Sequence, residues 1–354
     1  MEQLHPKITD SSPSRFIGES AVPQGPTNPG KRYAVSSPFL HKKQRRHFML
    51  YDVLPAIGTL FAIWYCAAHP LTKLDCSLFL LMWCLTGFSL SVGFHRHFCH
   101  RSFKAHPGVR IAFVVFGCMA ARSSMITWAS QHRRHHQLAD HDGDAHSPNL
   151  SGDGARGRLK GWTHAHFTWM WRHEYPNIVY YGSDLIQDKR VMRVDRYYSL
   201  WILVGLVVPA ALGALLSLSW QGAFTGFLWG GVVRLFVVGQ QISALNSLNH
   251  MVGTRPFKMS DNKSHNNALF GWLTWGEGWH NNHHAISSSA SFSFRWYQVD
   301  PGYWLIRALQ ALGLVWDVQI ADRERVLSLQ KKLEEQTSRA SVGQPGKFVA
   351  DRVK

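Results

Sequence analysis

Four apolar runs, arranged in two pairs, constrain what this chain of 354 residues can fold into. Each run approaches the ~20 helical residues needed to cross the ~30 Å hydrocarbon core of a bilayer. The segment within each pair is short and nearly uncharged, carrying only Lys73 and Asp75 in the first pair and Gln221 in the second. The runs are Met49–Ala68, Cys76–Phe94, Leu200–Trp220 and Ala223–Leu245. They predict four membrane-spanning helices in two hairpins.

The distribution of basic residues orients these hairpins. Lys and Arg number 38 against 22 Asp and Glu, and basic residues concentrate before the first run and between the two pairs. Basic segments stay on the cytoplasmic side, which places both termini and the central region there. We expect a multi-pass protein of the bacterial inner membrane or endoplasmic reticulum. The sequence has no arginine-rich helix, zinc-finger spacing or aromatic RNA-binding box, so we expect the membrane, and no nucleic acid, as partner.

The segments that flank the spans divide the chain into three parts. Residues 1–47 are rich in Ser, Pro, Gly and charge without apolar periodicity, which predicts a disordered basic tail. Residues 48–320 form the predicted integral-membrane domain, and residues 321–354 a charged cytoplasmic helix and tail. The apolar segment His106–Ala121 is too short to span and is bordered by arginines, which predicts a helix at the membrane surface.

The 21 histidines gather in three clusters on the predicted cytoplasmic side. Neutral imidazole is a common ligand for iron, zinc and copper, and positions i and i+4 share one helix face. The clusters are His95 with His100, then His132, His135 and His136, and finally His280, His283 and His284. Because His95 and His100 would lie about 140° apart on an ideal helix, they converge only if the helix ends or bends there.

These clusters favour a centre with two redox-active metal ions. One cluster alone could be a basic surface patch, but three of matching spacing on one membrane face favour metal binding. Eight imidazoles exceed the roughly three protein ligands of a zinc hydrolase. Soluble di-iron bundles use Glu and Glu-x-x-His ligands, whereas Glu277 is the only carboxylate inside a cluster.

The boxes H-x4-H, H-x2-HH and GEGWHNNHH (residues 276–284), with helical hairpins between them, resemble the membrane fatty acid desaturase superfamily. The similarity covers about residues 48–320 and is greatest to the stearoyl-CoA (delta-9) acyl desaturase branch. It implies an all-α membrane protein with four transmembrane helices in two hairpins and a cytoplasmic helical cap. It also implies that the cap holds two Fe²⁺ ions and that O₂ is the co-substrate.

The resemblance further implies a ligand set. An N-x3-H pair adds His250 as a ninth ligand and brings Asn246 to a metal through water. One iron would bind His95, His100, His132, His136 and His283, and the other His135, His250, His280 and His284. No catalytic residue is expected beyond these ligands.

Further residues are expected around the centre. Trp128 matches a tunnel-lining tryptophan of the family, although it could instead anchor the chain at the membrane interface. Gln131 stands where animal acyl-CoA enzymes contact the carrier, and we expect it to bind substrate; coenzyme A, a lipid and acyl carrier protein all remain possible carriers. Residues expected to orient the imidazoles by hydrogen bonds are Glu277, Asp140, Asp142 and Asn282.

The predicted reaction is O₂-dependent formation of a cis double bond, at delta-9 by resemblance, in a long saturated acyl chain. The cycle takes two external electrons, and the sequence carries no motif for flavin, haem or an iron–sulfur cluster. We therefore expect a separate donor such as ferredoxin, rubredoxin or cytochrome b5. It would meet a basic surface near Arg122, Arg133 and Arg190.

Two alternatives remain at this point. A hydroxylase on the same scaffold would use the same ligands and differ only in the fate of the substrate. A non-catalytic membrane metal-binding protein would instead place metal ligands inside the spans.

Overall fold

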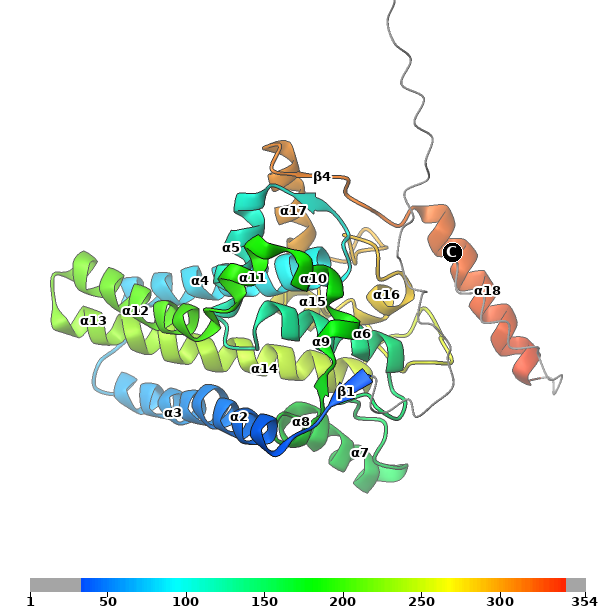
Figure 1. Cartoon of the computed structure of the whole chain (residues 1–354), viewed down its shortest axis with the longest axis horizontal. Helices are drawn as coiled ribbons and strands as arrows, with labels where there is room; N and C mark the ends of the chain where they lie inside the picture. The colour runs from blue at the N-terminus through cyan, green and yellow to red at the C-terminus, as the bar shows by residue number, and fades with distance from the viewer. Residues whose placement is uncertain (1–32, 342–354) are drawn as a thin grey trace, which may run out of the picture.

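The computed structural model describes residues 33–341 and contains, within them, four helices long and apolar enough to cross a membrane. Figure 1 shows these helices side by side as an elongated bundle, with shorter helices gathered toward one end as a cap. The spans are Pro38–Cys66, Lys73–Cys99, Tyr198–Ser217 and Trp220–His250. The predicted fold class, a helical membrane protein with two hairpins, is confirmed.

The first hairpin joins two helices that each contain a widened turn. The first helix comprises α2 (Pro38–Phe48), the π-helical η1 (Met49–Val53) and α3 (Leu54–Cys66). The second comprises α4 (Lys73–Phe88) and the π-helical η2 (Ser89–Cys99). Thr72 begins α4 with a capping box, because its hydroxyl accepts from Asp75 N while the Asp75 carboxylate accepts from Thr72 N.

The expectation of a disordered tail through residue 47 is wrong for its last part. Helix α2 begins at Pro38, where Ser37 caps it and the proline occupies the first turn. Just before it, β1 (Ala34–Val35) pairs antiparallel with β3 (Tyr175–Pro176). The polar composition of this segment concealed a helix that packs on α8 (Trp169–Arg172). The rest of the expected tail, residues 1–32, lies outside the described residues.

The second hairpin is packed closely through glycine. It consists of α12 (Tyr198–Ser217), α13 (Trp220–Gly226), the π-helical η4 (Phe227–Val233), α14 (Arg234–Ser247) and the short η5 (Leu248–His250). A Cβ on Gly213 would lie 2.0 Å from Gly222 O, so only glycine permits this approach of the two backbones. Small residues have this role in membrane helix packing generally.

Arg234 is fully buried in the fourth span, and among residues 33–341 its hydrogen bonds all go to backbone carbonyls. Its guanidinium reaches Met119 O at 2.6 Å, Gly205 O at 2.9 Å and Gly230 O at 3.2 Å. A charge at this depth is costly unless it is enclosed by protein. Arg234 therefore ties the second hairpin to the segment that follows α5.

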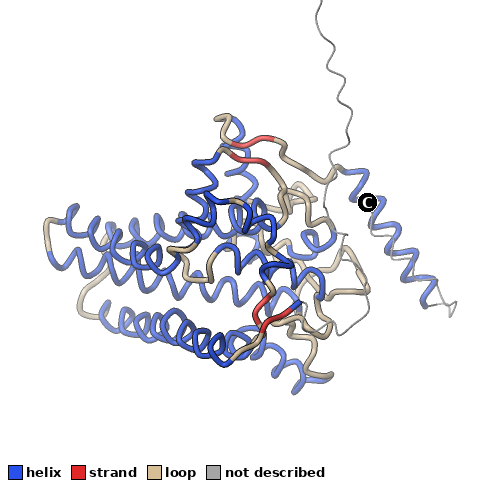
Figure 2. Tube along the Cα trace, viewed as in Figure 1, coloured by secondary structure: helices blue, strands red, loops and turns tan. Residues whose placement is uncertain are grey.

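The cap is built from short helices, coloured blue in Figure 2, and two small strand pairs, coloured red. Strand β2 (Lys104–Ala105) pairs with β4 (Val315–Trp316). The cap helices are α5 (Pro107–Cys118), α6 (Met125–Leu138), α7 (Gly154–Thr163), η3 (His164–Thr168), α8, α9 (Ile178–Tyr181), α10 (Ser183–Gln187), α11 (Lys189–Asp195), α15 (Ala268–Leu273), α16 (His280–Ala285), α17 (Pro301–Ala311) and α18 (Arg323–Ser341).

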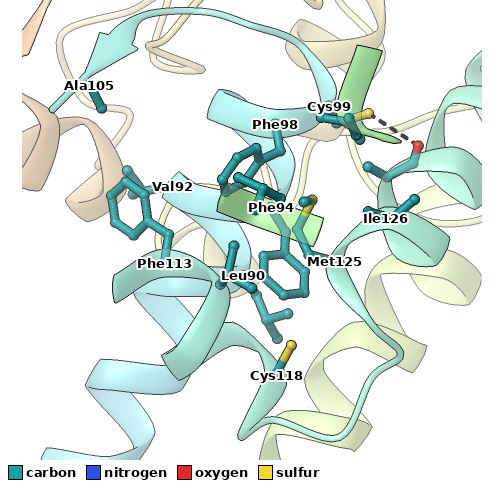
Figure 3. Packing of buried hydrophobic residues seen from close by; sticks show 14 of the residues in the cluster. Leu90, Val92, Phe94, Phe98, Cys99, Ala105, Phe113, Cys118, Met125 and Ile126 are labelled. Carbon is teal, nitrogen blue, oxygen red and sulfur yellow. Dashed lines mark hydrogen bonds between the residues drawn. The ribbon is translucent and has the colours of Figure 1, made fainter. Parts of the chain in front are cut away.

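The main core forms where η2, α5 and α6 meet (Figure 3). Helix α5 is too short to span, and it packs directly on η2 through two glycines. A Cβ on Gly93 would lie 2.5 Å from Phe113 Cβ, and one on Gly117 would lie 2.2 Å from Phe94 Cε1. The core therefore fixes η2, which carries the first histidine cluster, against the start of the cap.

Replacing Gly117 with alanine should destabilise the protein, because the new methyl group must displace the buried Phe94 ring. The expected loss is about 1–3 kcal/mol, the usual range for an overpacked core. Thermal unfolding in detergent measures it. Gly108→Ala in the first turn of the same helix is the control, since its Cβ would find His106 Nδ1 at 3.4 Å, an ordinary contact. Equal stability of the two variants would contradict this packing.

Candidate metal centre

The nine histidines singled out from the sequence meet where η2, α6, η5 and α16 come together. They form two groups, and within each group the candidate ligand nitrogens lie within 4.8 Å of one another. The first group is His95, His100, His132, His136 and His283, and the second is His135, His250, His280 and His284. This grouping coincides with the division that the family resemblance implies.

The local helix geometry explains the spacing of the first box. A π-helix closes its hydrogen bonds from residue i to i+5, and His100 N donates to His95 O at 3.1 Å. The widened turn brings the two rings to one side, with centroids 4.9 Å apart. The chain thus achieves through a π turn the convergence that an ideal α-helix forbids. In α6, His132 and His136 converge through ordinary i, i+4 spacing, with Nε2 atoms 3.0 Å apart.

The arrangement of nitrogens fits cations between the rings. Nδ1 of His95 donates to Glu277 over 2.5 Å, that of His135 to Asp144 over 2.9 Å, and that of His250 to Asp140 over 3.0 Å. These bonds leave lone pairs on the Nε2 atoms. Yet Nε2 of His95 lies 3.0 Å from that of His283, and Nε2 of His250 lies 3.0 Å from that of His280.

Only one ring of each pair has its tautomer fixed by a carboxylate, because Nδ1 of His280 and of His283 is buried without a hydrogen-bond partner in the described part of the chain. Nε2 of His100 is also buried and lacks a hydrogen-bond partner in the described part of the chain. Imidazoles held by a carboxylate on one nitrogen and free on the other are typical of metal sites. The residues present therefore fit metal ions in both groups.

The electrostatics keep these rings in the metal-binding form. Burial, reinforced by the neighbouring histidines, holds the pKa of His132, His136, His283 and His284 well below the usual range. A histidine with such a pKa is neutral at pH 7, as metal ligation requires. Burial acts in the same direction on His135, but the adjacent Asp144 carboxylate outweighs it and raises the pKa of that ring.

Three carboxylates hold the imidazoles, and the sequence had indicated two of them. Glu277 and Asp140 accept from His95 and His250. The prediction for Asp142 is wrong: its side chain is exposed, and Asp144, two residues later, holds His135. Gly143 between them has φ +99°, and this turn directs Asp144 back toward α6.

The fourth residue expected to orient an imidazole, Asn282, hydrogen-bonds to the neighbouring loops instead. Its amide donates to Phe292 O at 2.8 Å and to Gln298 Oε1 at 3.0 Å. Its Oδ1 accepts from Asn266 at 2.8 Å. Asn282 therefore fastens α16, the helix that carries the third cluster, to the loops on both sides of it.

Arg96 was not identified from the sequence, although it lies inside the first box. It is fully buried and pairs with Asp300 through both guanidinium nitrogens at 2.9 Å, with Glu277 3.6 Å away. It also donates to the backbone carbonyls of Ala290 and Trp275. Burial opposes ionisation of Glu277, but His95 and then Arg96 outweigh it, so the pKa of Glu277 is lowered. Arg96 thus keeps the Glu277 carboxylate ionised and in position, and this carboxylate in turn holds His95.

A small cavity opens beside the two groups. His95, His132 and His280 line it on the metal side, and Trp128 and Asn246 lie in its wall. The Trp128 ring stacks on His132, with centroids 5.1 Å apart. Gln131 is buried without a hydrogen-bond partner among the described residues, but it does not line this cavity.

The basic surface expected near Arg122, Arg133 and Arg190 is largely neutralised. Arg122 pairs with Asp52 at 2.6 Å and is nearly buried, and Arg133 pairs with Asp184 at 2.6 Å. Only Arg190 of the three is exposed. Arg122 therefore ties the cap to the first membrane helix, and Arg133 fastens two cap segments together, which is a correction to the expected docking surface.

The fold and site together define a class: an integral membrane protein with a buried histidine centre suited to two metal ions. The family model named "Fatty acid desaturase" matches residues 76–317. The chain belongs to the fatty acid desaturase family, as the resemblance of its histidine boxes had indicated.

Individual relatives agree with this membership. The hex-5-enoyl-[acyl-carrier protein] acetylenase of Moorena producens (strain JHB) is 43% identical over 297 residues, covering 83% of this chain and 92% of the relative. The sn-1 stearoyl-lipid 9-desaturase of Anabaena variabilis is 31% identical over 248 residues, covering 70% and 84%. Delta-9 acyl-lipid desaturase 1 of Arabidopsis thaliana is 29% identical over 296 residues, covering 82% and 92%. The chain is therefore an oxidoreductase that acts on acyl chains.

Asp144→Asn should weaken metal binding, because an amide holds the Nδ1–H of His135 less strongly than a carboxylate does. Loss of such a partner typically costs about 10–100-fold in metal affinity. Anaerobic titration of the metal-free protein with Fe²⁺ measures the change. Asp142→Asn, at the exposed carboxylate two residues earlier, is the matched control and should bind Fe²⁺ as the wild type does. Equal Fe²⁺ affinity in the two variants would show that Asp144 does not support metal binding through His135.

Proposed function

We propose that this chain is an O₂-dependent fatty-acyl desaturase that introduces a cis double bond, using two iron ions held by the nine histidines and two external electrons. The observation that carries the proposal is the convergence of nine imidazoles into groups of five and four beside one cavity. Family membership supplies the reaction class.

When bound, the iron pair would activate O₂ to remove hydrogen from an unactivated methylene, chemistry that no side chain supplies. The contribution of the protein is positioning. Trp128, held against His132, forms a flat wall along which an acyl chain can lie. Leu90, Ile242 and Leu245 make the neighbouring wall apolar. Precise placement of the reacting carbons matters, because a displacement of about 1 Å can cost about 10²-fold in rate.

Asn246 lines the same cavity as His95, His132 and His280, which supports its proposed approach to a metal through water. A separate redox protein such as ferredoxin, rubredoxin or cytochrome b5 would supply the electrons. The centre and both termini would lie on the cytoplasmic side, where such donors are found.

The relatives favour a second candidate outcome at the same site. The Moorena protein is named for an acetylenase reaction on an acyl chain bound to acyl carrier protein, whereas the two less similar relatives are named for lipid desaturation at position 9. Removing two hydrogens from an existing double bond gives a triple bond with the same machinery. Acyl carrier protein is accordingly the first carrier to test, ahead of coenzyme A and lipid.

His132→Ala, His136→Ala and His280→Ala should each abolish product, because every one removes an inward-facing nitrogen from the groups. Fatty acids from a heterologous host that expresses the chain with a ferredoxin system are profiled, with the double bond located. His141→Ala, an exposed histidine just after α6, is the control and should keep wild-type product levels.

Near-normal turnover in any of the three variants would exclude that histidine as a ligand. The same profile separates the candidate reactions. An unsaturated chain supports desaturation, an acetylenic chain supports the second candidate, and a hydroxylated chain would replace both with the hydroxylase alternative.

A further inference from the structure

We propose that two tryptophans close the acyl cavity just beyond the metal centre, so that this enzyme acts near the methyl end of its substrate. This inference rests on the proposed function and specifies its substrate class: a chain whose reacting carbons lie within about three carbons of its methyl end, because the whole cavity beside the histidines holds only about three such groups. It replaces the long chain and the delta-9 position that the family resemblance implies.

The cavity runs from the histidines toward the membrane bundle. One end is formed by His95, His132 and His280, and the other by Gly87 and Trp275. Gly87 precedes His95 by two helical turns on one continuous helix, about 12 Å at 1.5 Å per residue. The polar carrier of an acyl substrate stays in water, so the methyl end must be the part that enters this apolar end.

Trp275 forms the closure itself. A Cβ on Gly87 would lie 1.8 Å from Trp275 Cη2, so the indole occupies space that exists only because residue 87 is glycine. Trp275 is 4% exposed and has φ +55°, an unusual backbone conformation for such a residue. Its carbonyl accepts from Arg96 and from Gly302 N, each at 3.0 Å, which fixes the backbone and with it the direction of the ring.

Trp83 supports this closure from behind. It lies one turn before Gly87 on α4, and its ring centroid is 4.9 Å from that of Trp275. Its indole N–H donates to Gln241 Oε1 at 2.9 Å, and Gln241 Nε2 donates to Leu273 O at 2.7 Å. This chain of bonds links α4, α14 and the end of α15, and it explains an amide within a membrane span, where polar groups are costly.

The volume of the cavity sets the substrate class. It measures about 40 Å³, whereas sites for drug-sized ligands occupy about 300–1,000 Å³. A water-sized group needs roughly 10–15 Å³ on this measure, so about three such groups fit. A methylene is comparable in size. The distal half of a stearoyl chain does not fit, but the last few carbons of a short chain do.

The test uses full-length protein in membranes with its electron supply and acyl carrier protein loaded with saturated chains from hexanoyl to stearoyl. The wild type should yield products whose new bond lies within about three carbons of the methyl end, as the cavity volume requires. Trp275→Leu and Trp83→Leu should accept longer methyl ends and shift the preferred chain upward by two or more carbons. Trp272→Leu, an exposed tryptophan on α15 outside the cavity, should leave the preference unchanged.

The outcomes are separable. Wild-type protein that desaturates stearoyl chains at their middle as readily as short chains near their end overturns the inference while leaving the proposed function intact. Iron-loaded wild type that makes no unsaturated or acetylenic product at any length overturns the proposed function itself. Trp83 contacts none of the nine histidines in the two groups, so an unchanged preference in a folded Trp83→Leu protein counts against the closure even if Trp275→Leu fails to fold.

Discussion

The structure depends on nine imidazoles that converge in a buried space. Glu277, Asp140 and Asp144 each accept a hydrogen bond from Nδ1 of one ring, those of His95, His250 and His135 respectively. This bond leaves Nε2, the inner nitrogen, with a lone pair in the neutral ring. Metal ions at the centre would bind to these inner nitrogens. Binding free energy at a site of this kind contributes to folding free energy, so metal loading and stability of the cap are coupled.

The proposed ligands come from both hairpins and from the cap, and different contacts hold each of these segments in place. The π turn of η2 brings His95 and His100 together, and Arg96 beneath them pairs with Asp300 near the start of α17. Asn282 fastens α16 to the loops beside it. The centre is therefore positioned by buried polar networks, which hold geometry well only when every member is satisfied.

Local patterns carried most of the predictions that agree with the structure. The four spans follow from apolar runs, and the convergence of His132 with His136 and of His280 with His284 follows from i, i+4 spacing, both of which are readable within one segment. The division of the nine histidines into two groups was instead implied by the family resemblance. What was missed depends on contacts between distant segments. The α2 helix packs on α8, Asp144 reaches His135 because of the backbone turn at Gly143, and Arg122 finds Asp52 seventy positions away. Charge counts indicated a basic face, but they could not show that two of its arginines are already paired.

One short segment combines reactivity and substrate selection. Within residues 275–284, Trp275 closes the cavity, Glu277 holds His95, and the histidines of α16 face the metals. The Trp275 carbonyl and the Glu277 carboxylate both lie against the Arg96 guanidinium, so the closure and the centre share one buried anchor. The position of the new bond is thus set by the distance between two parts of a single rigid loop. A change of side chain at position 275 alters the depth of the cavity, whereas a change at Arg96 would displace the closure and the ligands together.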